Sequence, residues 1–147
     1  LVLSPTHPLA SKQSIAPSDL VDQTLIAYPV EAKRLDVIAK FMAPAEVSFA
    51  KIRTTELTAM LIQLVASERG VAALPDWVAA EYEKKGWIVT RPLISPNSSN
   101  KDLPPSMRNQ NRHGVFCQLF AATREKSQEI AYMQGFAKLL DELVKPY

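Results

Sequence analysis

The chain has 147 residues, of which 47% are apolar and 22% charged, and its formal net charge is +2. These values are typical of one globular domain or two small lobes, and the small, scattered positive charge does not indicate nucleic-acid binding. A single cysteine, Cys117, excludes an internal disulfide and fits a reducing compartment. We find neither a membrane-spanning apolar run nor a signal peptide. The reducing compartment that a lone cysteine fits leads us to expect a cytoplasmic protein.

Strands and helices alternate along most of the chain. Short apolar runs that end at proline or glycine predict the strands, and apolar residues at helical spacing predict the helices. The expected strands are 1–3, 24–28, 47–53, 71–74, 87–91 and 116–122. The expected helices are a single turn at 17–20 and longer helices at 32–42, 56–69, 77–85 and 127–145.

The stretch from Thr54 to Trp77 holds a helix, a strand and the start of the next helix. Thr54 and Thr55 are suited to cap the first helix, and Gly70 to end it in the left-handed conformation. The run 71–74 is wholly apolar, as is typical of a strand buried on both faces of a parallel sheet. We therefore place this stretch at the centre of an α/β core.

The order of elements from residue 18 to 91 predicts an α/β fold with a mostly parallel sheet. In such sheets ligands bind beyond the carboxyl ends of the strands. Those ends carry the candidate ligand-binding residues, which are Tyr28, Pro29, Val30, Thr54, Thr55 and Pro75.

Helix N-termini near Glu31 and Glu56 would place backbone N–H groups at the same edge, where they favour a ligand carboxylate. The two threonines can hydrogen-bond a ligand or simply cap the helix, and the two readings are compatible. Glu31 and Glu56 can bind a ligand ammonium or complement the helix dipole. The edge therefore predicts a small anionic or zwitterionic ligand.

The search for catalytic chemistry is negative. There is no nucleophile elbow, phosphate loop or dinucleotide fingerprint, and no metal-ligand spacing. His7 is interpreted as a turn residue, His113 as a solvated loop residue and Cys117 as a small buried strand residue. The charged residues at 81–85 are interpreted as a solvated helix face. We expect no enzyme activity and no cofactor.

The segment 94–115 is rich in Ser, Asn, Pro, Lys and Arg and nearly free of core residues. This composition predicts a flexible loop.

Several runs resemble the effector-binding domain of LysR-type transcriptional regulators. The runs at 3–10 (LSPTHPLA) and 18–20 (SDL) are similar to its crossover between lobes, and those at 61–66 (LIQLVA) and 70–75 (GVAALP) to its second lobe. The runs at 28–30 (YPV), 34–37 (RLDV) and 73–78 (ALPDWV) are similar to the branch that activates methionine biosynthesis genes. The resemblance covers about 1–93 and 116–144.

The resemblance implies a periplasmic-binding-protein-like fold with three-layer αβα lobes, the first of them incomplete. It divides the chain into a returning part of lobe I (1–12), lobe II (13–93), the loop 94–115 and a return to lobe I (116–147). It implies homocysteine as the co-inducer and a DNA-binding winged helix-turn-helix that we expect to precede this chain. It further implies a homodimer here, a homotetramer at full length and no membrane partner.

A periplasmic-type solute-binding module for a small anionic or amino-acid ligand is the alternative, because it shares this architecture. An enzyme of small α/β type is the third and least supported class, since no nucleophile, base or metal set is assembled.

Overall fold

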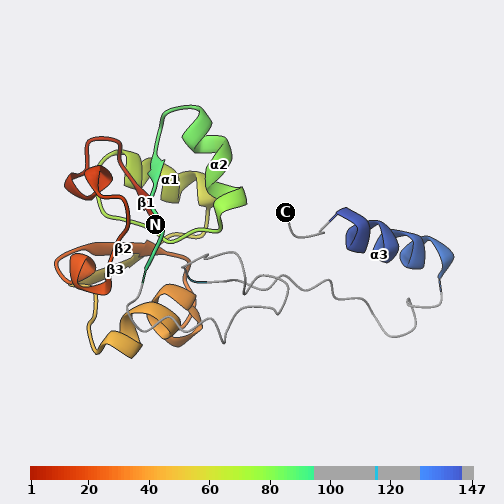
Figure 1. Ribbon diagram of the computed structural model, residues 1–147, viewed down its shortest axis with the longest axis horizontal. Coiled ribbons are helices and arrows are strands. Elements are labelled where there is room, and N and C mark those ends of the chain that lie inside the picture. Colours follow the sequence, from red (N-terminus) through yellow and green to blue (C-terminus); the bar gives the residue numbers. More distant parts are fainter. Residues whose placement is uncertain (95–114, 116–129, 144–147) are drawn as a thin grey trace.

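The computed structural model describes residues 1–94, 115 and 130–143 (Figure 1). Its strands in that part of the chain are β1 (Val2–Leu3), β2 (Thr24–Ala27), β3 (Lys51–Thr54) and β4 (Val89–Thr90). Its α-helices are α1 (Thr58–Ala66), α2 (Asp76–Lys84) and α3 (Ala131–Leu143). Shorter helices are η1 (Pro8–Ser11), η2 (Pro17–Leu20), η3 (Ala32–Arg34), η4 (Val37–Met42) and η5 (Ala43–Ala45).

The strands form a mixed sheet centred on residues 71–72. β2 and β3 pair in parallel from Thr24↔Lys51 to Ala27↔Thr54, and Val71 bridges Leu25, also in parallel. On the other side, Ala72 bridges Val2 antiparallel, and β1 pairs antiparallel with β4. The last strand expected in the parallel series, 87–91, is therefore shorter than predicted and runs antiparallel to the start of the chain.

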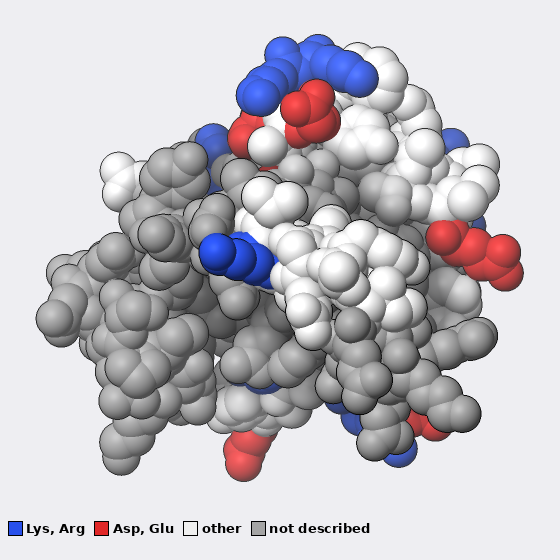
Figure 2. All heavy atoms as spheres, turned by 90° about the vertical axis from the view of Figure 1, so that its right-hand side faces the viewer, with Lys and Arg blue, Asp and Glu red and all other residues white. Residues whose placement is uncertain are grey.

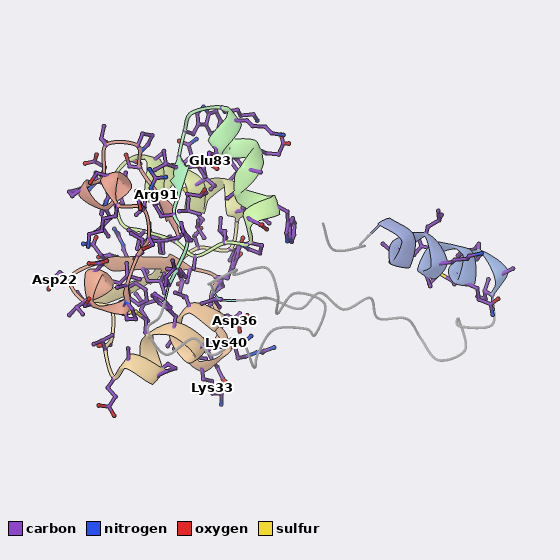
Figure 3. The ribbon with its side chains drawn as sticks, viewed as in Figure 1. Asp22, Lys33, Asp36, Lys40, Glu83 and Arg91 are labelled. Carbon is purple, nitrogen blue, oxygen red and sulfur yellow. The ribbon has the colours of Figure 1, made fainter. Side chains whose placement is uncertain are left out.

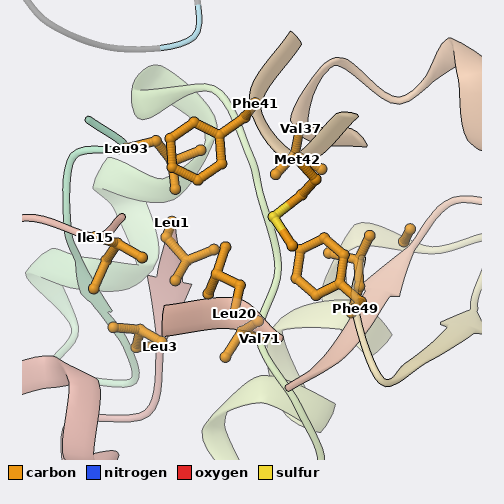
Figure 4. Packing of buried hydrophobic residues seen from close by; sticks show 12 residues of the cluster. Leu1, Leu3, Ile15, Leu20, Val37, Phe41, Met42, Phe49, Val71 and Leu93 are labelled. Atoms are coloured by element: carbon orange, nitrogen blue, oxygen red, sulfur yellow. The ribbon is translucent and has the colours of Figure 1, made fainter. Parts of the chain in front are cut away.

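Alternating side chains divide the core into two clusters, because successive residues of a strand point to opposite faces. Leu25 and Ala27 pack into one cluster with the η4 residues Phe41 and Met42 (Figure 4). Ile26 packs into the other cluster, which holds the buried side chains of α1 and α2: Leu61, Ile62, Val65 and Ala79. Figure 1 shows α1 and α2 above the sheet and η4 below it, which is the expected αβα layering.

The prediction of one regular helix at 32–42 is wrong, because three short helices of other types take its place. The chain forms the 3-10 turn η3, becomes extended at Leu35, forms the π-helix η4 and then the 3-10 turn η5, which has Pro44 in its first turn. The wider turn of a π-helix lets Val37, Phe41 and Met42 all be buried on the sheet side. Tertiary packing therefore overrides the simple helical spacing.

The predicted start of α1 is also wrong. The β2–β3 ladder runs on through Thr54, and the Thr55 N–H donates to the carbonyl of Ala27 at 2.9 Å. Both threonines therefore pair through their backbones with β2. The helix α1 begins only at Thr58, after Leu57 at its N-cap position. The expected strand 47–53 is correspondingly shifted to 51–54.

Gly70 has a different role from the predicted helix cap. The left-handed residue after α1 is Glu68, with φ of 59°, whereas Gly70 has φ of 154°. A Cβ atom at Gly70 would lie 2.4 Å from the carbonyl oxygen of Thr24 on β2. Glycine is therefore required because the backbone passes directly against the neighbouring strand.

The turn at 17–20 is confirmed as η2, with proline in its first turn. The Asp19 carboxylate accepts the N–H of Ala16 at 3.0 Å and the Lys12 ammonium at 2.5 Å. The Lys12 hydrogen bond, helped by Ala16, outweighs desolvation and lowers the pKa of Asp19. This carboxylate thus joins η2 to the end of η1.

The last helix predicted is confirmed as α3, which Figure 1 draws apart from the layers around the sheet. The expected strand 116–122 and most of the loop 94–115, including His113, lie outside the described residues, as does Cys117. The proposed boundaries at residues 12, 93 and 115 stay predictions. Among the described helices, none has the length and apolarity needed to cross a membrane.

Candidate functional site

The parallel pairing of β2 and β3 brings most of the predicted ligand-binding residues to one edge. Thr54 ends β3 opposite Ala27, so Tyr28 and Thr55 follow directly on neighbouring strands. Pro29 forms a tight turn in which the Val30 N–H donates to the Tyr28 carbonyl at 2.8 Å. Val30 is left 44% exposed at the rim.

Pro75 lies beyond the strand segment 71–72 on the other side of β2. It occupies the N-cap position of α2, and its carbonyl accepts the N–H groups of Val78 and Ala79. Pro75 therefore sets where α2 starts, and its predicted contact with a ligand stays a prediction. Trp77 and Val78, which follow it, line the hollow beside Tyr28.

That hollow is a groove of about 630 Å³ between the end of β2, the start of α1 and the length of α2. Its lining comes from these elements: Tyr28, Thr58, Trp77, Val78, Glu81, Tyr82 and Lys85. The Tyr28 and Thr58 hydroxyls are hydrogen-bonded to each other at 2.7 Å. The hollow is open to solvent over much of its extent, because Trp77 and the charged residues of α2 that line it are exposed.

Helical spacing explains why α2 supplies most of the wall. Residues four apart lie on one face of a helix, so Trp77, Glu81 and Lys85 form one row and Val78 and Tyr82 the next. Ala79, on the opposite face, is buried in the second core cluster and holds α2 to the sheet. Tyr28 and Tyr82 pack against the same cluster, which supports the base of the groove.

The groove carries charges of both signs. Glu81 makes a long ion pair with Lys84, 3.6 Å between oxygen and nitrogen, and both side chains are more than two-thirds exposed. The Lys85 ammonium lies 5.9 Å from the Tyr82 ring centre and 5.5 Å from that of Trp87. Figure 2 shows this side of the molecule, with blue and red side chains at the top, where α2 ends in Figure 1.

The helix N-termini predicted near Glu31 and Glu56 differ in length and position from those of the structure. Glu31 precedes only the three-residue helix η3 and pairs with Lys33 at 3.0 Å. Glu56 precedes Leu57 and lies outside α1. Across the described part of the chain, no group of His, Cys, Asp and Glu side chains is arranged to hold a metal ion.

Of the predicted ligand-binding residues, Tyr28 lines this hollow, whereas the α2 residues that line it are not among those predicted. The charged residues at 81–85 are exposed, which confirms the predicted solvated helix face. Aromatic residues at positions 77 and 82, interleaved with Glu81 and Lys85 at helical spacing, are the signal that could have found the groove.

Comparison with known proteins assigns the family. The family described as the LysR substrate binding domain matches residues 1–143. The chain belongs to this family. The periplasmic-binding-protein-like α/β fold expected from the sequence is thereby confirmed.

The chain is similar to several proteins called HTH-type transcriptional regulator MetR. Those of Salmonella typhimurium and Escherichia coli K12 are each 38% identical over 138 residues, which is 94% of this chain. The MetR of Haemophilus influenzae is 33% identical over 135 residues. The chain spans 38% of the length of these relatives.

A solved structure agrees with this similarity. The regulatory domain of MetR from Neisseria meningitidis, a LysR family regulator, superposes with a TM-score of 0.72 at 33% identity. The superposition covers 96% of this chain and 57% of that one. The similarity to MetR therefore extends from the sequence to the arrangement of the elements.

Proposed function

We propose that this chain is the effector-binding part of a MetR-like transcriptional regulator that senses homocysteine or a closely similar amino acid. The similarity to MetR over 94% of the chain carries this proposal. The parallel pairing of β2 and β3 supports it, because ligands of such sheets bind beyond the carboxyl ends of the strands, here at Tyr28, Pro29, Val30, Thr54 and Thr55. The genes controlled would be those of methionine biosynthesis.

The regulation would operate by a shift in population. A ligand held at the edge of the sheet stabilises the arrangement of lobes or subunits that it binds best. DNA would be bound by a winged helix-turn-helix in another part of the full-length protein, as a homotetramer in the cytoplasm. The relatives are called transcriptional regulators, so we propose no enzyme activity and no cofactor.

Calorimetric titration of the full-length gene product with L-homocysteine, L-methionine and L-cysteine tests the proposal. Homocysteine should bind and raise the melting temperature, because free ligand at 100 times its Kd adds about 2.7 kcal/mol to the free energy of unfolding. Absence of both heat and thermal shift with all these amino acids would reject the effector assignment.

A further inference from the structure

We propose that Thr6 and Glu68 form a latch that fastens the segment after β1 to the end of α1. Residues 3–10 are the run that is similar to the crossover between the lobes of this family. A latch on this run resists a change of angle between the lobes. The latch goes beyond the proposed function, because it forms in the protein without a ligand.

The sheet brings the two residues together, although they are 62 positions apart in the sequence. Val2 bridges Ala72 antiparallel, so the chain that leaves β1 runs back toward the turn between α1 and residue 71. At this turn the Thr6 hydroxyl donates to the Glu68 carboxylate. A hydrogen bond to an ionised acceptor is stronger than one between neutral groups.

The latch extends inward to a buried hydroxyl. Ser4 is only 2% exposed, and its Oγ atom lies 2.9 Å from Oγ1 of Thr6. Thr6 gives its one hydroxyl proton to Glu68, so the Ser4 hydroxyl donates to the Thr6 oxygen. A buried hydroxyl without a partner is costly. The three side chains therefore form one directed chain of hydrogen bonds from the interior to the surface.

The backbone of Glu68 adopts a costly conformation. Its φ of 59° is left-handed, and helix ends usually place glycine in this conformation. A glycine at position 68 would relieve the strain but would have no side chain to reach Thr6. Glu46 is also left-handed, with φ of 57°, and within the described residues its side chain makes no hydrogen bond or ion pair. Glu46 therefore shows the same strain without a latch.

The latch can open without unfolding the core, because the side chains of Thr6 and Glu68 are exposed. Local amides report such an opening. The His7 N–H donates to the Ser4 carbonyl at 3.1 Å, and the Ala10 N–H donates to the His7 carbonyl at 2.8 Å. Both hydrogen bonds lie within the latched segment, so their protection from exchange depends on how firmly that segment is held.

Hydrogen exchange of the full-length protein without ligand tests the latch. Thr6→Val and Glu68→Ala should each speed exchange of the amides at 6–10 about threefold or more. The double variant should be no faster than the faster single variant, because each substitution breaks the same hydrogen bond. The Ile26 amide, which donates to Val71 in the centre of the sheet, should keep its rate. Thr6→Ser retains the hydroxyl and should remain close to the unsubstituted protein.

Glycine substitution separates the latch from the strain. Glu68→Gly should melt at a higher temperature than Glu68→Ala, because glycine adopts the left-handed conformation freely. Both variants should nevertheless speed exchange at 6–10 equally, since both lack the carboxylate. Glu46→Gly and Glu46→Ala are the matched controls. They should differ in melting temperature in the same direction and leave exchange at 6–10 unchanged.

Three outcomes would overturn the latch. One is additive acceleration by Thr6→Val and Glu68→Ala, which would mean that the two side chains act independently. Another is acceleration at Ile26 in the same proportion as at 6–10, which would mark a general loss of stability. The last is unchanged exchange in Glu68→Gly. No ligand enters these measurements, so their failure leaves the proposed function intact, and a failure to bind homocysteine leaves the latch intact.

Discussion

Several residues that the sequence assigns to one element make their contacts with a neighbouring strand or turn instead. Thr54 and Thr55 look like helix caps in the sequence but extend the β2–β3 ladder. His7 looks like a turn residue and is one, yet it also makes specific contacts. Its Nδ1 accepts the N–H of Leu9 at 3.1 Å, and its Nε2 lies 3.2 Å from the amide oxygen of Gln23.

Gly70 gives the sharpest prediction at this scale. Gly70→Ala should lower the free energy of unfolding by about 1–3 kcal/mol or more, because the new Cβ would meet the Thr24 carbonyl in a backbone conformation that favours glycine. Urea denaturation measures the loss. Gly86→Ala is the control: Gly86 also has positive φ, 71°, but a Cβ there meets no atom within 4 Å. Equal losses at both sites would contradict the close-approach explanation.

At the scale of elements, hydrogen bonds made by side chains hold short helices together across the loops between them. The η1 and η2 turns are too short to be stable alone, and the Asp19 carboxylate joins them through Lys12 and Ala16. Such links could not be predicted from the helical spacing, which shows only that a turn begins at Pro17. The predicted element types were correct where an apolar face is long, as in α1, and wrong where packing on the sheet decides the geometry, as in η4.

Asp19 predicts a specific dependence of stability on pH. Its pKa is lowered in the folded protein, so the folded state gains stability from the ionised carboxylate above the ordinary pKa and loses it as pH falls through the folded value. Asp19→Asn should therefore cost about 1 kcal/mol at pH 7 and progressively less toward pH 3.

Denaturant midpoints at several pH values test this. Asp22→Asn is the control, because within the described residues Asp22 makes no hydrogen bond or ion pair through its side chain and is exposed (Figure 3). A cost for Asp19→Asn that stays constant from pH 7 to pH 3 would show that the carboxylate charge is not responsible.

At the scale of the whole molecule, the start of the chain and residues about ninety positions later form one unit. β1 pairs with β4, and the Arg91 guanidinium donates to the carbonyls of Lys12 at 2.7 Å, Thr90 at 2.6 Å and Ala10. Beside β4, Glu83 accepts the N–H of Thr90 at 2.8 Å and so ties α2 to the same edge (Figure 3). These contacts fix α2, and therefore the groove, relative to the start of the chain.

Arg91→Lys should destabilise the protein by about 1–3 kcal/mol, because a lysine ammonium cannot reach three carbonyls from the fixed fork of a guanidinium. Thermal unfolding monitored by circular dichroism measures the change. Arg69→Lys, at an exposed position, is the matched control and should be close to neutral. A neutral Arg91→Lys would mean that β1–β4 pairing holds this edge without the guanidinium.

The sequence by itself determined the alternation of strands and helices, the LysR family and the edge at which Tyr28 lies, because each of these depends on local spacing and on short runs. Only the tertiary structure decided the antiparallel return of β1 to β4, the use of Thr54 and Thr55 by the sheet and the groove along α2. Those features depend on which strands become neighbours. The residue pattern of one strand does not reveal which distant strand it pairs with. That pairing is decided when both faces of the sheet are buried in the folded protein.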